Sequence, residues 1–324
     1  MKKDGVKWED RVGRRLKLRD LHVLLAVVQT GSMAKAADRL AVSHPVVSKT
    51  ISELEHIVGK RLFDRSVRGV APTIYGQALA QCASTVFDDM RQAVRQIEFL
   101  ADPTVGELRF ACPEAIAAGF IQAVANRFMR RYPKVALDVV QTATVTARYR
   151  ELRAREIELL IGRIPAPFVE DDLVMEPLFD EPLLVVAGAN CPWVRRRRVQ
   201  LADLINESWV LPPNDSVPGI LGLELFRACG VAYPRASMAT LSIHLQQTLL
   251  STGSFLTLLP GSLLHFGGQR LGFKQVPVKL PPQHSLVGFI TLKGRTLSPV
   301  AQHFIDHARA VAAPLSKVRQ LRGQ

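Results

Sequence analysis

Three short amphipathic segments within residues 18–58 constrain the fold of this 324-residue chain more than any other feature. Their apolar residues recur every three or four positions, as they do on one face of a helix. Gly31 ends the first segment, Ser32 and Ser43 are predicted to cap the second and third, and Gly59 ends the third. Two helices joined by so short a turn indicate a helix-turn-helix, although any two amphipathic helices could imitate the pattern.

The third helix carries small polar and basic side chains on the face opposite its apolar stripe, where they could reach base edges. The residues predicted to contact DNA in this region are Ser32, Ser43, His44, Pro45, Ser48, Lys49 and Ser52. Two short extended pieces follow around an Arg68-Gly69 turn. They predict a β-wing that carries Arg65 and Arg68 to the phosphate backbone.

Positive charge is concentrated in the same region. Residues 1–72 hold fifteen Lys or Arg and eight Asp or Glu, a net charge of +7 out of +13 for the whole chain. A basic end on a nearly balanced body favours a polyanionic partner. The alternative is a solubilising face.

A long helix without internal proline is predicted from Thr73, its cap, to residue 101, before Asp102-Pro103. Its apolar positions recur at spacings of three or four: Leu79, Cys82, Val86, Met90, Ala93, Ile97 and Leu100. Such a seam suits a partner helix and therefore a dimer. The alternative is a helix packed on its own globule.

From Val105 onward, short apolar strands alternate with helices. Strands are expected at 108–112, 135–140, 157–161, 183–187, 209–211, 255–258 and 286–292, and helices at 115–131, 145–155, 223–228 and 299–312. This alternation predicts parallel βαβ units arranged in two lobes. A ligand cleft is expected between the lobes, at the carboxyl ends of the strands.

The cleft can be located from the strand ends, but its ligand cannot be identified. The residues predicted to bind an effector are Cys112, Pro113, Glu114, Thr142, Thr144, Gly162, Arg163, Pro213 and Ser216. Cys112 is interpreted as a small residue lining the pocket, with a redox thiol as the alternative. Glu114 beside a helix N-terminus would weaken the binding of anions, which favours a polyhydroxylated or mixed ligand over a simple carboxylate.

Several classes of protein are disfavoured. No run of eighteen apolar residues predicts a membrane span, and the charged N-terminus does not resemble a secretory leader, so a cytoplasmic protein is expected. The four cysteines are scattered, and no histidine spacing suits a metal site, so neither metal nor cofactor is expected. No G-x-S-x-G, Walker or G-x-G-x-x-G motif supports an enzyme. Four consecutive arginines, 195–198, are interpreted as a solvated loop, with contact to DNA or a neighbouring subunit as the alternative.

Five motifs resemble the LysR-type transcriptional regulators, and the match extends from about Leu16 to Ala313. The matching motifs are residues 31–37 (GSMAKAA), 42–49 (VSHPVVSK), 62–65 (LFDR), 130–135 (RRYPKV) and 158–162 (ELLIG). The resemblance implies a winged helix-turn-helix, a dimerising linker helix and an effector domain of two α/β lobes similar to type 2 periplasmic binding proteins. It also implies a dimer of dimers. His44 departs from the Gln that is common in the family, and Lys49 departs from a more usual Arg, so base preference at these positions is open.

The predicted organisation has four parts. A basic extension covers 1–15, a winged helix-turn-helix 16–73, a linker helix 74–101 and a two-lobed α/β effector domain 105–324, with lobe 1 at about 105–178 and 272–313 and lobe 2 at about 179–271. The extension is either an arm that contacts phosphates or an untrimmed start.

The leading hypothesis is a regulator that binds double-stranded operator or promoter DNA and responds to a small-molecule effector, as a homodimer or a dimer of dimers. RNA polymerase is a further candidate partner, and no membrane is expected. The alternative is a cytoplasmic solute-binding receptor whose N-terminal helices serve assembly only. An enzyme is the third hypothesis.

Overall fold

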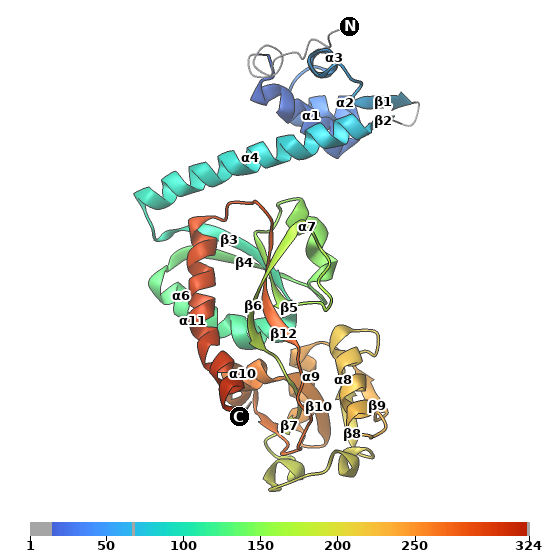
Figure 1. Cartoon of the computed structure of the whole chain (residues 1–324), viewed down its shortest axis with the longest axis vertical. Helices are drawn as coiled ribbons and strands as arrows, with labels where there is room; N and C mark the ends of the chain where they lie inside the picture. Colours follow the sequence, from blue (N-terminus) through green and yellow to red (C-terminus); the bar gives the residue numbers. More distant parts are fainter. Residues whose placement is uncertain (1–14, 67–68, 323–324) are drawn as a thin grey trace. The chain divides into compact units, whose positions relative to one another are not determined.

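A computed structural model describes residues 15–66 and 69–322, with the backbone alone for 65, 66 and 316–322. The chain divides into two compact units, the first ending at Ala93 and the second beginning at Val94. The long helix α4 (Ile74–Ala101) begins in the first unit and ends in the second (Figure 1). Within the described residues, no helix is long and apolar enough to cross a membrane.

The first unit is a three-helix cluster followed by a hairpin. Its elements are α1 (Leu18–Thr30), α2 (Met33–Leu40), α3 (His44–Val58), β1 (Phe63–Ser66), β2 (Gly69–Pro72) and the start of α4. Gly31 and Gly59 end α1 and α3 in left-handed conformations (φ 63° and 71°), as their sequence positions predict. The core beneath these elements includes Leu24, Val47 and Ile51, all fully buried.

Lobe 1 of the second unit is a five-stranded sheet in the order β4-β3-β5-β12-β6. Its elements are β3 (Val105–Cys112), α5 (Glu114–Ile116), the π-helix η2 (Ala117–Ile121), α6 (Gln122–Arg131), β4 (Lys134–Gln141), the 3-10 helix η3 (Thr146–Arg148), α7 (Tyr149–Arg153), β5 (Leu159–Arg163), β6 (Leu173–Asp180), β12 (Leu286–Leu292) and α11 (Pro299–Arg322). Helices α6 and α11 cover one face of the sheet and α7 the other (Figure 1). Alternate residues of β3 therefore enter different cores, Phe110 beneath α6 and α11 and Ala111 beneath α7.

Lobe 2 is a second five-stranded sheet, in the order β11-β7-β10-β8-β9. Its elements are β7 (Leu183–Gly188), η4 (Pro192–Arg195), η5 (Leu201–Leu204), β8 (Ser208–Leu211), α8 (Val217–Ala228), β9 (Ala236–Ala239), α9 (Ile243–Ser251), β10 (Phe255–Pro260), α10 (Gly261–Leu271) and β11 (Phe273–Gln275). Trp209 and Phe226 are fully buried on one side of this sheet, and Leu250 and Leu263 on the other.

The predicted parallel units are present, but each sheet also contains an antiparallel strand, so both sheets are mixed. In lobe 1, β12 runs antiparallel to β5 and β6, and in lobe 2, β7 runs antiparallel to β10 and β11. The chain leaves lobe 1 after β6 and returns as β12 beside it, so the returning strand runs in the opposite direction. The remaining pairs, β3 with β4 and β5, and β8 with β9 and β10, are parallel as predicted.

Several further elements were not predicted from the sequence, and others have different limits in the structure. The strands β6, β9 and β11 and the helices α9 and α10 were not predicted, and α11 extends well beyond the expected end at 312. The helix expected over 145–155 is confined to η3 and α7. Lobe 2 also continues past the predicted limit of 271, because β11 pairs with β7 and Val278 is part of the lobe 2 core.

Candidate nucleic-acid interface and effector site

The turn between α2 and α3 has the geometry of a helix-turn-helix. The Ser32 hydroxyl caps α2 by accepting from the Lys35 N–H at 3.4 Å, as predicted. Ala41 ends α2 in a left-handed conformation (φ 52°), and α3 begins only three residues later. The prediction that the Ser43 side chain caps α3 is wrong, because its hydroxyl accepts no capping hydrogen bond. Its hydroxyl is therefore available to a ligand.

The outward face of α3 is polar and accessible. Ser43, His44, Pro45, Lys49 and Ser52 are exposed and Ser48 is half-buried, as the sequence pattern predicts. Two of these side chains have partners on α3 itself. The Ser52 hydroxyl donates to the Ser48 carbonyl at 2.9 Å, and Lys49 lies 3.8 Å from the exposed carboxylate of Glu53. Such an exposed pair contributes little to stability, so Lys49 remains available to another partner.

The hairpin of β1 and β2 is the predicted wing, paired from Phe63 with Pro72 to Ser66 with Gly69. Arg68 lies outside the described residues, and the side chain of Arg65 is likewise not described. The wing is attached to both neighbouring helices. The Val70 N–H donates to the Gly31 carbonyl at the end of α1 (3.1 Å).

Glu55 on α3 fixes the start of the wing and was missed by sequence reasoning. Its Oε1 accepts from the backbone N–H groups of Leu62 (2.8 Å) and Phe63 (3.3 Å). The carboxylate therefore sets the position of the hairpin relative to the helix that is predicted to read bases. The only available signal was the position of an acidic residue eight residues before a strand.

The predicted apolar seam of α4 has a buried part and an exposed part. Leu79 packs against the core of the first unit, whereas Met90, Ile97 and Leu100 are 46%, 67% and 71% exposed. Large apolar side chains that line one face of a helix and stay exposed are typical of a surface that contacts a partner. The exposed part of the seam, from Met90 to Leu100, is therefore the portion available to a partner.

Cys112 lies in the core of lobe 1 and does not line the predicted effector pocket. Its side chain is fully buried in the lobe 1 core with Phe110 and Phe289, and burial raises the pKa of its thiol to about 12. A protonated, enclosed thiol is a poor nucleophile and a poor redox sensor. The strand end was correctly predicted, but the alternation of side chains points this residue inward.

Three other predicted segments of lobe 1 do come together. A Cβ on Gly162 would lie 2.8 Å from Val145 Cγ1 and 3.1 Å from Pro113 Cδ, so only glycine fits between these segments. The adjoining loop is held by its own hydroxyls, with Thr142 Oγ1 donating to the Thr144 carbonyl (2.7 Å). Thr144 Oγ1 lies 2.9 Å from Thr146 Oγ1.

Glu114 connects lobe 1 to a helix of lobe 2 that the sequence did not predict. Its Oε1 accepts from the Ile243 N–H at the first turn of α9 (3.1 Å), where the Ser242 hydroxyl caps the helix. The carboxylate thus accepts from a backbone N–H at the α9 N-terminus, which would otherwise be available to an anionic ligand. In contrast, Ser216 and Pro213 form the cap of α8. The Ser216 hydroxyl donates to the Pro213 carbonyl (2.6 Å) and accepts from Gly219 N–H (3.2 Å).

Arg163 lies where the chain crosses between the lobes. Its Nη1 donates to the Glu181 carbonyl at 2.8 Å and to the Ser285 hydroxyl. Burial lowers the pKa of Arg163, and burial raises the pKa of the Glu181 carboxyl, whose oxygens accept from the Ser262 N–H (2.8 Å) and hydroxyl. Among the described residues, the buried Nη2 of Arg163 has no hydrogen-bond partner.

The end of α4 is fastened to lobe 1 through Glu158, one of the residues of the 158–162 motif. The buried Glu158 carboxylate accepts from Arg95 on α4 at 3.0 Å, and it also accepts from the N–H (2.9 Å) and hydroxyl (3.1 Å) of Ser298 before α11. Phe99 stacks near His303 of α11, with ring centroids 5.3 Å apart. This contact set joins the linker helix to the effector unit.

A winged helix-turn-helix, a linker helix and a two-lobed α/β unit together define a DNA-binding transcriptional regulator with an effector-binding domain. Comparison with known families agrees. The LysR substrate binding domain matches residues 101–313, and the helix-turn-helix of the lysR family of bacterial regulatory proteins matches residues 18–77. The chain belongs to the LysR family of transcriptional regulators.

Curated relatives support the same conclusion. The HTH-type transcriptional regulator YdcI of Escherichia coli is 27% identical over 91% of this chain and 96% of that protein. The transcriptional dual regulator GltC of Bacillus subtilis is 28% identical over 90% of this chain and 96% of that protein. The HTH-type transcriptional regulator GbpR of Rhizobium radiobacter is 30% identical over 71% of this chain and 76% of that protein.

Solved structures share the fold. A full-length OxyR variant from Pseudomonas aeruginosa has a TM-score of 0.58 at 22% identity, covering 92% of this chain and 94% of its own. Full-length CbnR in complex with its target DNA has a TM-score of 0.52 at 21% identity, covering 92% of this chain and all of its own. The predicted family and regulatory function are confirmed, and because the family and these relatives are regulators, so is the prediction that the chain is not an enzyme.

Proposed function

We propose that this regulator reads its operator with the N-terminal half of α3 and responds to a small molecule held between the two lobes. The main observation in support of DNA binding is that one face of α3 is buried and the opposite face is exposed. Val47, Ile51 and Leu54 are fully buried, while Ser43 and His44 are exposed at the tip. Together with Pro45, Ser48, Lys49 and Ser52, these side chains enter the major groove, and Ser32 contacts the adjoining backbone from the start of α2.

Arg65 and Arg68 of the wing hold backbone phosphates in this proposal, with Glu55 fixing the hairpin. Phosphate and base contacts respond differently to substitution. Arg65→Ala should weaken binding to all DNA and reduce the slope of log affinity against log salt by about one unit. His44→Ala should change the preference among operator sequences and leave the salt slope unaltered. Gel-shift titrations at several salt concentrations measure both, and equal losses on every sequence for His44→Ala would remove its base-reading role.

The effector site in this proposal lies at the crossover between the lobes, near Pro113, Glu114, Gly162 and Arg163. Arg163 offers a buried N–H without a partner, which a hydroxyl or carbonyl oxygen would satisfy. Thr142 and Thr144 offer hydroxyls from lobe 1, and Pro213 and Ser216 line the lobe 2 side. Because Glu114 already accepts from the α9 N-terminus, the site favours a polyhydroxylated or mixed ligand over a simple carboxylate.

Ligand screening by thermal shift tests this preference, since a ligand that binds only the folded state raises the melting temperature. Sugars, sugar acids and dicarboxylates are compared on the parent protein, on Glu114→Gln and on Glu224→Gln, which removes an exposed carboxylate of α8. Glu114→Gln should shift the preference toward carboxylates, whereas Glu224→Gln should not. A parent protein that responds to dicarboxylates alone would contradict the proposed ligand class.

LysR regulators bind DNA and effectors as oligomers, and here we place the dimer contact on the exposed stripe from Met90 to Leu100. Two dimers associate into a tetramer in this proposal, RNA polymerase is a further partner at the promoter, and the protein resides in the cytoplasm with its DNA. Light scattering with multi-angle detection measures the mass, and a monomeric parent protein would contradict the assembly.

A further inference from the structure

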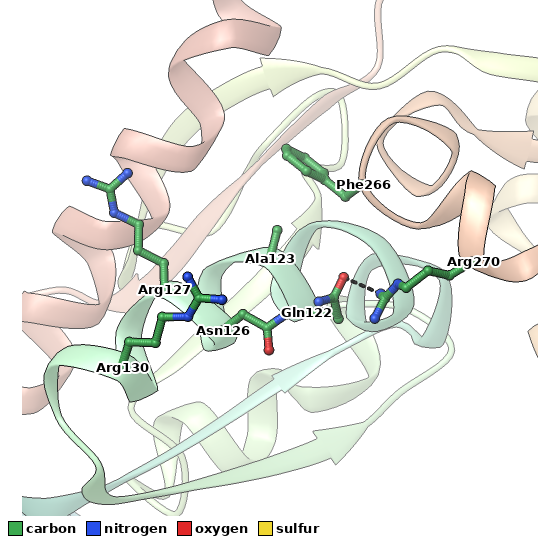
Figure 2. A pocket seen from close by; sticks show the side chains of 7 residues that line it. All are labelled: Gln122, Ala123, Asn126, Arg127, Arg130, Phe266 and Arg270. Atoms are coloured by element: carbon green, nitrogen blue, oxygen red, sulfur yellow. Dashed lines mark hydrogen bonds between the residues drawn. The ribbon is translucent and has the colours of Figure 1, made fainter.

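A pocket lies on the surface of the effector unit, and none of its lining residues belongs to the crossover residues described above. It has a volume of about 470 Å³ and is formed by α6 of lobe 1 and α10 of lobe 2 (Figure 2). Its polar lining consists of Gln122, Asn126, Arg127, Arg130 and Arg270, with Phe266 on the remaining side. Small-molecule sites commonly have volumes of about 300 to 1,000 Å³, so the size suits a metabolite.

The lining carries three positive charges and no carboxylate. Arg270 is hydrogen-bonded through Nη2 to Gln122 Oε1 at 2.6 Å, across the two helices (Figure 2). Arg127 and Arg130, one turn apart on α6, have no ion pair or hydrogen bond to any residue that the structure describes. A site with donors only is complementary to an anion.

Several other arginines of the same unit are paired with carboxylates. Arg153 binds Asp172 at 2.6 Å, Arg309 binds Glu176 at 2.7 Å, and Arg95 binds Glu158 at 3.0 Å. The fold therefore supplies carboxylate partners to several of its arginines elsewhere. The three arginines that line this pocket have no such partner and lie together, which leaves them available to an external anion.

We propose that this arginine pocket binds a small anion bearing two or more phosphate or carboxylate groups, as a site separate from the interlobe effector site. Arg127 and Arg130 bind one charged group, and Arg270 a second from the opposite side. Phe266, one turn before Arg270, covers the uncharged part of the ligand. Because α6 belongs to lobe 1 and α10 to lobe 2, the ligand connects the lobes.

Isothermal titration of the full-length protein at constant ionic strength tests the proposal, with inorganic pyrophosphate and citrate as probes. The pocket variant is Arg127→Gln with Arg130→Gln. Its matched control, Arg197→Gln with Arg198→Gln, removes the same charge from two exposed arginines elsewhere. All four positions are exposed, so both variants should keep the parent's melting temperature in the absence of anion.

The parent and the control should bind at least one probe, and the pocket variant should bind it about tenfold or more weakly, which corresponds to about 1.4 kcal/mol. The tighter probe identifies phosphate or carboxylate as the preferred group. The proposal is overturned if neither probe binds the parent protein, or if the pocket variant and the control bind equally. A pocket variant that loses affinity for non-specific DNA, while the parent binds neither probe, would assign the arginines to DNA instead.

Discussion

The residues that hold the wing in place are close together in the sequence, whereas those that hold the effector site together are far apart in the sequence. In the winged unit, Glu55 fixes the wing through residues only seven and eight positions away. In the effector unit, Glu114 reaches Ile243 across 129 positions, and Arg163 reaches Ser285 across 122. The first site is therefore a local motif, and the second exists only when both lobes are folded and correctly placed.

The largest effect is expected from a charge in the exposed stripe of α4. Ile97 is 67% exposed in the single chain, so Ile97→Asp should leave each subunit folded. In a dimer the same carboxylate would be buried without a partner, which costs on the order of several kcal/mol. We expect a lower mass by light scattering and loss of operator binding, with Ile97→Leu as the control that keeps both. An unchanged mass and affinity for Ile97→Asp would show that this stripe is not the dimer contact.

The next effect concerns the attachment of α4 to lobe 1. Glu158→Ala leaves the Ser298 N–H and hydroxyl without their buried acceptor and removes one of the two carboxylates beside the partly exposed Arg95. Because each hydrogen bond to a charged group contributes about 1.5–3 kcal/mol, we expect a loss of about 3 kcal/mol or more. Glu107→Ala is the matched control, since it removes the exposed carboxylate 3.4 Å from the same arginine and should cost less than about 1 kcal/mol.

Hydrogen–deuterium exchange locates this effect. For Glu158→Ala, faster exchange is expected both at the end of α4 and at the start of α11, whereas Glu107→Ala should leave both segments protected. Equal exchange in the two variants would mean that Glu158 does not join the linker helix to the effector unit.

The same contrast in distance explains what the sequence could predict. The helix-turn-helix, the wing and the limits of α4 follow from local periodicity, capping residues and glycines such as Gly31 and Gly59. Cys112 was misplaced because a strand end near a cleft does not reveal which way a side chain points when both faces of the sheet are covered. The α9 N-terminus was missed because the helix has only nine residues and follows a short edge strand.

A smaller effect is expected at the wing. Glu55→Ala removes an acceptor of two backbone N–H groups, and hydrogen bonds to charged groups contribute about 1.5–3 kcal/mol. Urea unfolding should show this loss for the winged unit, with weaker DNA binding because the hairpin is no longer fixed to α3. Glu53→Ala, which removes only the exposed carboxylate beside Lys49, should change stability by less than about 1 kcal/mol. If the two variants unfold alike, Glu55 does not hold the wing.

The smallest effect is chemical and leaves the fold unchanged. Burial raises the pKa of the Cys112 thiol to about 12, so at pH 8 it stays protonated as well as enclosed. Cys82 is exposed and should react with a thiol reagent in the native protein, whereas Cys112 and Cys191 should react only after unfolding. Mass spectrometry of labelled peptides distinguishes them. Rapid labelling of Cys112 in the native protein would mean that its thiol is accessible and lines the effector cleft, as the sequence predicted.

The most direct test of sequence reading by α3 is the ratio of specific to non-specific affinity at one salt concentration. Fluorescence anisotropy compares DNA from upstream of the protein's own coding region with a scrambled duplex of the same length. Specific affinities of DNA-binding proteins typically exceed non-specific ones by about 10³ or more. We predict such a preference for the parent protein and an altered one for His44→Ala. A parent protein that binds both duplexes equally, or a His44→Ala variant with the parent's full preference, would contradict base reading at the tip of α3.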